Sequence, residues 1–453
     1  MIRERSLRAN SLSSLFASGG VFAITLAMPA VLARSITASD YQVYATAMAF
    51  LPLALLLSQS LRNCAGSALI VAMQRAQGAD VARAYRRIVL LVTGLVLAGG
   101  VLVTEFLRFF SLVGDLDQGL LRFGVYCILI NVSGIGFSLL VTGPATASQD
   151  FVPENLLKLA PPALLLALLI AVFIVAPDDE LWWIFAAVAV SPWPLAGWLM
   201  LRYHGAVGRW FDTSQTGTKR VSDPLTLNAI FRFLAVSSAS VGWWNLTAYF
   251  ATSITVAVVA LILPEDVVAF GMAFSLIGLL SGGLIAISTP IASRVASIPL
   301  DDIAARVVAF RRFNGYFILY ILAIALFVLL VPARLYELWV GTQYAGPVHS
   351  MLLLLLPATV LRLQTMCFTL FVMSIGRQST LWISPLVESV VATGGSLLLV
   401  SSLGITGIAL ALALSAALRL AMTVAYDIRR NRDLFPIQWK DMLISRRWLV
   451  RGE

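Results

Sequence analysis

Apolar runs of roughly 20 residues recur from one end of the chain to the other, and they constrain the fold more than any other feature. A run of this length crosses the hydrocarbon core of a bilayer as one α-helix. Of the 453 residues, 59% are hydrophobic and 12% are charged, with a mean hydropathy of +0.89. A soluble domain has roughly 25% charged residues. The sequence therefore predicts an all-α, polytopic membrane protein with short connecting loops and no separate soluble domain.

Twelve membrane-spanning helices are predicted. Their approximate ranges are 13–33, 41–73, 88–105, 121–142, 159–176, 182–201, 229–258, 267–291, 314–332, 348–374, 380–402 and 406–426. Basic residues alternate between the loops: 24 of the 32 Lys and Arg fall on one side of the membrane, four on the other and four within spans. Short cytoplasmic loops retain Lys and Arg, so both termini are predicted to be cytoplasmic. The net charge of +9 is then a topology signal, and nothing in the sequence indicates nucleic-acid binding.

The two halves of the chain echo one another. The second predicted helix begins as DYQVYATAMAF at Asp40 and the eighth as DVVAFGMAF at Asp266, and each is followed by a basic amphipathic stretch. We expect an N-terminal six-helix half (1–226), a C-terminal six-helix half (227–426) and a basic cytoplasmic tail (427–453). Repeated helix bundles of this kind usually surround a central cavity in transporters.

The stretch AVLARSITASDYQVYATAMAFLPLALLLSQSLRN, joined to this twelve-span plan, resembles the polysaccharide flippases. These are Wzx-type members of the multidrug/oligosaccharidyl-lipid/polysaccharide exporter superfamily. The resemblance implies a bacterial inner-membrane flippase that moves a polyprenyl-pyrophosphate-linked oligosaccharide by alternating access. It also implies contact with membrane lipids, coupling to a proton or sodium ion, and partnership with polysaccharide polymerase or export machinery.

Arginines within the spans are candidates for binding the anionic headgroup. Arg62 and Arg362 lie near the midplane, one in each half, and Arg binds phosphate through two hydrogen bonds. Gln59 and Asn63 share a helix face with Arg62. Asn131 and Asn245 complete the predicted cavity set, while Arg34 and Arg232 are predicted to lie in vestibules near the membrane faces. For the cavity residues the alternative is helix-to-helix packing, and for Arg34 and Arg232 it is snorkelling of the guanidinium to the membrane surface.

Glu388 and Arg419 are predicted to lie level on neighbouring antiparallel helices, each seven or eight residues from the cytoplasmic side. They form either a structural ion pair or a coupling or gating pair. Glu388 is the only acidic residue well inside any predicted span, so it is the candidate proton carrier among them.

No pattern indicates enzymatic chemistry or a cofactor. Cys64, Cys127 and Cys367 all fall in apolar runs, and His204 and His349 are predicted to lie in loops, so no metal site is expected. The alternatives to a flippase are a multidrug or small-molecule antiporter of the same superfamily and, more distantly, a membrane-embedded glycan polymerase.

Overall fold

The structure is a computed structural model. It describes residues 7–65, 69, 72–73, 76, 78–109, 118–148, 150–175, 180–212, 226–296, 298, 302–374, 380–433, 436–437 and 442. Within these ranges every regular element is a helix and there are no strands. The prediction of an all-α membrane protein is confirmed. The chain divides into two compact units, Met1–Leu246 and Thr247–Glu453.

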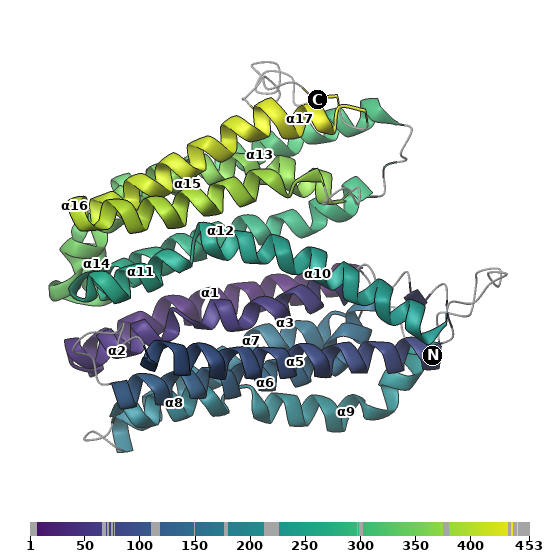
Figure 1. The fold of residues 1–453 in the computed structure, drawn as a ribbon, viewed down its shortest axis with the longest axis horizontal. Coiled ribbons are helices and arrows are strands. Elements are labelled where there is room, and N and C mark those ends of the chain that lie inside the picture. Colours follow the sequence, from purple (N-terminus) through teal and green to yellow (C-terminus); the bar gives the residue numbers. More distant parts are fainter. Residues whose placement is uncertain are drawn as a thin grey trace. The chain divides into compact units, whose positions relative to one another are not determined.

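The first unit contains the described helices from α1 to α9 and most of α10 (Figure 1). These are α1 Leu7–Ser35, α2 Ala38–Met48, α3 Leu51–Ala65, α5 Gly78–Phe109, α6 Gln118–Ala147, α7 Val152–Val175, α8 Glu180–Val190, α9 Trp193–Asp212 and α10 Leu227–Ala251. A further helical residue, at 69, and the pair at 72–73 lie between α3 and α5.

The second unit begins within α10 and continues to the C-terminus. Its helices are α11 Ile254–Ile262, η2 Pro264–Asp266, α12 Val267–Ala296, α13 Ile303–Leu330, α14 Ala333–Val340, α15 Thr342–Ser374, α16 Ile383–Met422, η4 Thr423–Asp427 and α17 Ile428–Arg430. The sequence places the division between halves at 226/227, at the start of α10, and that division remains a prediction.

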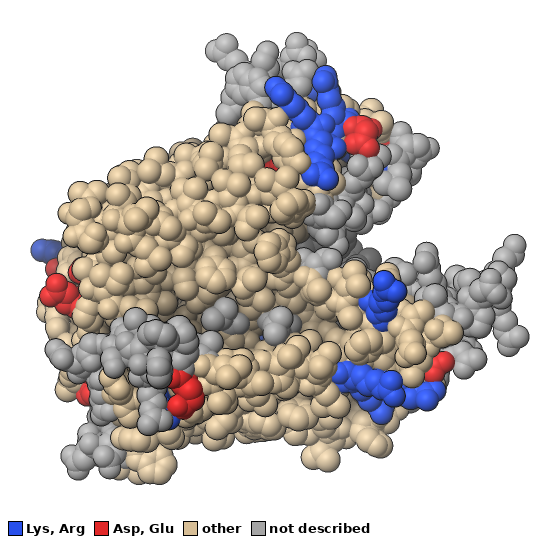
Figure 2. Space-filling model, in the orientation of Figure 1, with Lys and Arg blue, Asp and Glu red and all other residues tan. Residues whose placement is uncertain are grey.

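Ten helical stretches of the described residues are long and apolar enough to cross a membrane. Large apolar side chains are exposed along them; Leu398 is 77% exposed and Leu102 is 71% exposed. In Figure 2 the visible charged side chains gather at the ends of the helices, and the helix flanks are almost uncharged. A surface of this kind suits contact with lipid, because the backbone polar groups are already paired within the helices.

Several predicted spans are interrupted. The range 41–73 contains a break between α2 and α3, 182–201 one between α8 and α9, and 229–258 one between α10 and α11. Pro52 and Pro192 lie at the first two breaks, and a proline removes one backbone hydrogen bond from a helix. The third break, at Thr252 and Ser253, has no proline. Hydropathy alone does not detect such breaks, since the flanking residues stay apolar.

The two basic amphipathic stretches form the first turns of long helices. GADVARAYRR opens α5, and the residues from Ile303 to Arg312 open α13. Asp302 caps α13 by accepting a hydrogen bond from the backbone N–H of Ala305 at 3.0 Å. Each span therefore continues as a helix into its basic stretch.

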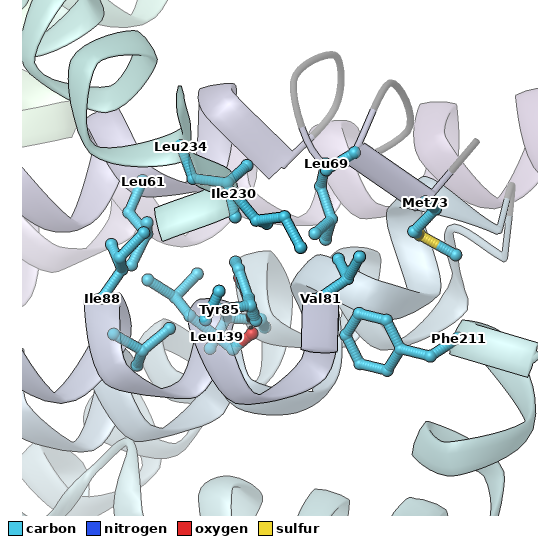
Figure 3. Close-up of a cluster of buried hydrophobic side chains, with 14 residues drawn as sticks. Leu61, Leu69, Met73, Val81, Tyr85, Ile88, Leu139, Phe211, Ile230 and Leu234 are labelled. Carbon is cyan, nitrogen blue, oxygen red and sulfur yellow. Dashed lines mark hydrogen bonds between the residues drawn. The ribbon is translucent and has the colours of Figure 1, made fainter. Parts of the chain in front are cut away.

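The core of the first unit joins helices far apart in sequence (Figure 3). Leu61 from α3, Ile88 from α5, and Ile230 and Leu234 from α10 are all at most 2% exposed. Within this cluster the Tyr85 hydroxyl donates to the Leu139 carbonyl at 3.0 Å. This bond joins α5 to α6 within the core of the first unit.

In the second unit, α16 is a helical hairpin rather than one rod. Gly404 has φ 56° and ψ −137°, a conformation open essentially only to glycine, and the chain reverses there. Gly407 packs against the Leu399 carbonyl, and Gly395 faces Ala411 across the two limbs. The two limbs run side by side in Figure 1. They correspond to the last two predicted spans, with almost no loop between them.

Candidate functional site

The candidate site is a buried charge cluster inside the second unit, centred on Glu388. The Glu388 side chain is fully buried, and each of its oxygens contacts one guanidinium. Oε2 accepts from Nη1 of Arg419 at 2.5 Å, across the hairpin, and Oε1 accepts from Nε of Arg362 on α15 at 2.7 Å. The predicted juxtaposition of Glu388 and Arg419 is present. Their coupling or gating role stays a prediction.

Arg362 also connects the cluster to the break between α10 and α11. Its Nη2 donates to the carbonyl of Ala251, the last residue of α10, at 2.8 Å. A helix end leaves carbonyls without amide partners, and a cation there also interacts favourably with the helix dipole. Two hydroxyls of α16 bind neighbouring carbonyls: Ser389 donates to Thr247 at 2.5 Å and Thr393 to Phe250 at 2.8 Å. These side chains provide hydrogen-bond donors for the carbonyls beside the break, which lies within a membrane-spanning stretch.

The cluster carries one negative and two positive charges. One carboxylate shared by two guanidinium groups leaves a net charge of +1 among Arg362, Glu388 and Arg419. Arg362 is the more accessible arginine, with 22% of its side chain exposed against 9% for Arg419. A buried excess of positive charge attracts an anion, because the low local dielectric strengthens the interaction.

A second polar pairing lies further along the hairpin and was missed from the sequence. The Ser384 hydroxyl donates to Oδ2 of Asp427 at 2.6 Å, and Thr380 donates to Oδ1 of Asn431 at 3.0 Å. Asp427 and Asn431 are at most 1% exposed. The last predicted span ends at residue 426, so the sequence places Asp427 in the tail. A signal was present in the sequence, since SAALRLAMTVAYD keeps an apolar pattern up to the aspartate.

In the first unit, the predicted cavity residues Gln59, Arg62 and Asn63 belong to α3, but their side chains lie outside the described part of the structure. Asn245 on α10 is partly buried, and its Nδ2 donates to the Ser60 hydroxyl of α3 at 3.1 Å. The two helices are thus joined one residue from the predicted α3 face.

Asn131 on α6 is 8% exposed and supports the break between α8 and α9. Its Nδ2 donates to the Val188 carbonyl at 2.6 Å and to the Ser191 hydroxyl at 3.2 Å. Arg34, in the last turn of α1, and Arg232, in the second turn of α10, are both exposed. Binding roles for these three residues remain predictions.

The structure corrects the placement of both histidines, which lie on helices rather than in loops. His204 is on α9, and His349 is on α15, where its ring stacks on Tyr336 with centroids 5.2 Å apart. Cys127 and Cys367 are buried, as expected for apolar packing, while Cys64 has no described side chain. Among the described residues, no group of three or more His, Cys, Asp or Glu side chains could hold a metal ion.

Comparison with solved structures places this fold among membrane transporters. The chain superimposes on an inward-facing multidrug resistance MATE family transporter of the MOP superfamily with a TM-score of 0.67 at 15% identity, covering 94% of this chain and 98% of that one. It superimposes on the lipid II flippase MurJ in an inward closed conformation with a TM-score of 0.64 at 12% identity, covering 98% and 91%. The MATE multidrug transporter DinF-BH gives 0.64 at 15% identity, covering 96% and 98%.

No protein-family model matches the chain, and no curated protein matches its sequence. The apolar helices and the structural matches together define the class: a multi-pass membrane protein with the architecture of MATE and MurJ transporters. The structural neighbours are transporters rather than enzymes.

Proposed function

We propose that this chain is a bacterial inner-membrane flippase that translocates a polyprenyl-pyrophosphate-linked oligosaccharide for surface polysaccharide synthesis. The transporter fold supports movement of a substrate across the membrane, and the sequence resemblance to polysaccharide flippases supports the lipid-linked glycan. The observation that carries the choice of an anionic substrate is the net positive charge of the cluster formed by Arg362, Glu388 and Arg419.

Arg362 is the group proposed to attract the pyrophosphate. Two of its nitrogens are engaged, Nε by Glu388 and Nη2 by Ala251, and it remains partly exposed. Arg62 in the first unit is proposed to contribute from the other half of the chain, with Gln59, Asn63, Asn131 and Asn245 supplying polar contacts to the headgroup. Arg34 and Arg232 are proposed to draw the anion toward the entrances.

Alternating access moves the headgroup while the polyprenyl tail stays in the bilayer. The interrupted helix α10–α11 offers a place where backbone geometry can change, since Thr252 and Ser253 separate the two segments. Both termini are proposed to be cytoplasmic, in agreement with the distribution of Lys and Arg along the sequence. A proton or sodium ion is proposed to drive transport, and polysaccharide polymerase or export machinery to receive the product.

The test is mass spectrometry of polyprenyl-linked glycans in cells with and without the gene. Loss of the protein should cause the complete oligosaccharide to accumulate on its lipid carrier at the cytoplasmic face. Complementation with Arg362→Gln should fail, whereas Arg334→Gln, which removes an exposed arginine on α14, should restore export. The membrane levels of both variants must match the wild type.

A multidrug antiporter is the second candidate, because two of the similar structures are multidrug MATE transporters. Such a protein would protect cells from organic cations and leave the lipid-linked pool unchanged. The same deletion strain, exposed to a panel of cationic dyes, distinguishes the two. Unchanged lipid-linked glycans together with greater dye sensitivity would reject the flippase.

A further inference from the structure

Asp427 is a buried carboxylate with one oxygen left over. The residue is 1% exposed, and its Oδ2 accepts the hydrogen bond from Ser384. Its Oδ1 is buried and has no hydrogen-bond partner among the described residues. Burying an ionised carboxylate is costly unless both of its oxygens are satisfied. Something beyond these hydrogen bonds must therefore stabilise the group.

The local backbone turns Asp427 toward the other limb of the hairpin. In a regular α-helix, eight residues from Arg419 would place it about 80° around the helix axis. Residues Thr423–Asp427 instead form a π-helical turn, which is wider and rotates the chain less for each residue. Glu388 and Ser384 lie one turn apart on the first limb. Glu388 then contacts Arg419 of the second limb, and Ser384 contacts Asp427. Short π-helical turns of this kind are frequent at functional sites.

Two arginines influence the Asp427 carboxylate electrostatically, Arg419 and Arg430. Arg419 donates from Nη1 to Glu388, and its buried Nε has no hydrogen-bond partner among the described residues. Arg430 donates to the Tyr426 hydroxyl at 2.7 Å and lies 5.8 Å from the centre of the same ring. The hydroxyls that face the carboxylate come from Ser384 and Thr423. Within the described part of the chain, Asp427 therefore has hard oxygen neighbours and no direct cationic partner.

Glu388 is a poorer acceptor for a further cation. Both of its oxygens are already occupied by guanidinium groups, and removing either contact would leave a buried arginine without its counter-ion. The oxygen left over beside this cluster belongs to Asp427. Both oxygens of Glu388, the candidate proton carrier from the sequence, bind arginines, whereas Asp427 has an oxygen without a hydrogen-bond partner among the described residues.

We propose that Asp427 is a binding site for a small monovalent cation, a proton or Na⁺, and that its occupancy sets the net charge of the arginine cluster. With Asp427 ionised, the four groups Arg362, Arg419, Glu388 and Asp427 sum to zero. With the cation bound, they sum to +1, which favours an anion at Arg362. The effect on an anion at Arg362 rests on the proposed function, whereas cation binding at Asp427 does not.

A direct test of the site is infrared spectroscopy of the purified full-length protein in lipid nanodiscs. Aspartate carrying ¹³C in its side-chain carboxyl group separates Asp signals from those of Glu388. The wild type should show the band of a buried, protonated aspartic acid, which disappears as the pH rises, and Asp427→Asn should lack it. Asp433→Asn, which alters an exposed carboxylate six residues further on, should retain the band.

The two cations are separated by repeating the titration with Na⁺ replaced by N-methylglucamine at equal ionic strength. If Na⁺ removes the band at constant pH, the site binds Na⁺ in competition with the proton; if only pH removes it, the ligand is the proton. Identical spectra for the wild type and Asp427→Asn, in the presence and absence of Na⁺, would overturn the site. Ser384→Ala provides a milder variant, which should shift the pH at which the band disappears.

The effect on the arginine cluster is measured by calorimetry with inorganic pyrophosphate as the probe. Pyrophosphate affinity of the wild type should fall about tenfold, within the usual range of coupling between sites, as the cation leaves Asp427. The affinity of Asp427→Asn should stay high under the same change. Equal dependence in both proteins would overturn the coupling. No binding by either would reject both the coupling and the proposed anionic substrate, whereas the infrared result would still decide the cation site.

Discussion

Glu388 and Arg419 face one another across the two limbs of a single helical hairpin, with Oε2 and Nη1 2.5 Å apart. The other Glu388 oxygen binds Arg362 on a different helix, so one carboxylate joins three helical segments. Because the Glu388 carboxylate is completely buried, its replacement would leave the nearly buried Arg419 without a counter-ion. The stability of the second unit should depend on this residue.

Glu388→Gln should lower the free energy of unfolding by about 3–5 kcal/mol, because the nearly buried Arg419 and the partly buried Arg362 lose their counter-ion. Thermal unfolding of the detergent-purified protein, followed by tryptophan fluorescence, measures the change. The double variant Glu388→Gln, Arg419→Gln should recover part of the loss, since one uncompensated charge is then gone. A single variant as stable as the wild type would show that the ion pair contributes nothing to folding.

Gly143→Ala should destabilise the first unit by about 1–3 kcal/mol, the usual cost of overpacking a core. A Cβ at this position would collide with the Tyr85 hydroxyl, which is held by its hydrogen bond to Leu139. Tyr85→Phe removes that hydroxyl. In a double-mutant cycle measured by thermal unfolding, the double variant should lose less stability than the two single variants lose together. Strict additivity would contradict the predicted contact.

Gly404→Ala should cost about 1–3 kcal/mol, because the positive φ at the hairpin is strained for any residue with a Cβ. No described atom lies within 4 Å of the Cβ position, so the effect would come from the backbone alone. Gly394→Ala is the matched control: it lies on α16, has an equally open Cβ position and no positive φ. It should be neutral or stabilising in the same unfolding assay. Equal effects at both positions would argue against the sharp reversal at Gly404.

Asn131→Ala should reduce stability by about 1–3 kcal/mol, because the buried Val188 carbonyl loses the shorter of its two side-chain hydrogen bonds and keeps only the one from the Ser191 hydroxyl. The measurement pairs thermal unfolding with the lipid-linked glycan assay. Reduced stability with export preserved at matched protein levels identifies Asn131 as a packing residue. Unchanged stability with lost export would assign it to the substrate cavity.

The proposed topology places α14 outside the cell and α17 in the cytoplasm. Single cysteines introduced at Leu338, which is 72% exposed, and at Arg430, which is exposed, should react from opposite sides in a variant lacking the three native cysteines. A membrane-impermeant maleimide on intact cells should label Leu338→Cys, whereas Arg430→Cys should be labelled only after the cells are broken. Labelling of both from outside would reverse or invalidate the predicted orientation.

Parts of the candidate site could be predicted from the sequence, and the reason is local geometry. Glu388 and Arg419 lie at similar distances from the reversal of one hairpin, so helix periodicity was enough to predict that they meet. Arg362 was identified as a buried arginine, but its contacts with Glu388 and Ala251 depend on the packing of α15 against two other segments. No sequence periodicity relates those positions.

Asp427 shows the limit more sharply. A hydropathy pattern places it one residue beyond a span, and a regular helix would place it about 80° around the axis from Arg419. The π-helical turn at Thr423–Asp427 reduces this rotation, and the Asp427 carboxylate accepts from Ser384. A similar limit applies to the helix break at Thr252 and Ser253, because the carbonyls just before it, at Thr247, Phe250 and Ala251, accept from side chains more than 100 residues away.

The sequence by itself determined that this protein is a helical membrane protein, because long apolar runs can cross a bilayer only when their backbone groups are paired within the segment. It also determined which few polar residues would have to be buried. The tertiary structure decided which of them meet, since a buried charge takes its partner from whichever helix packs against it. For Glu388 that partner set is Arg419 from the same hairpin and Arg362 from α15, and for Asp427 the described residues leave one oxygen without a donor.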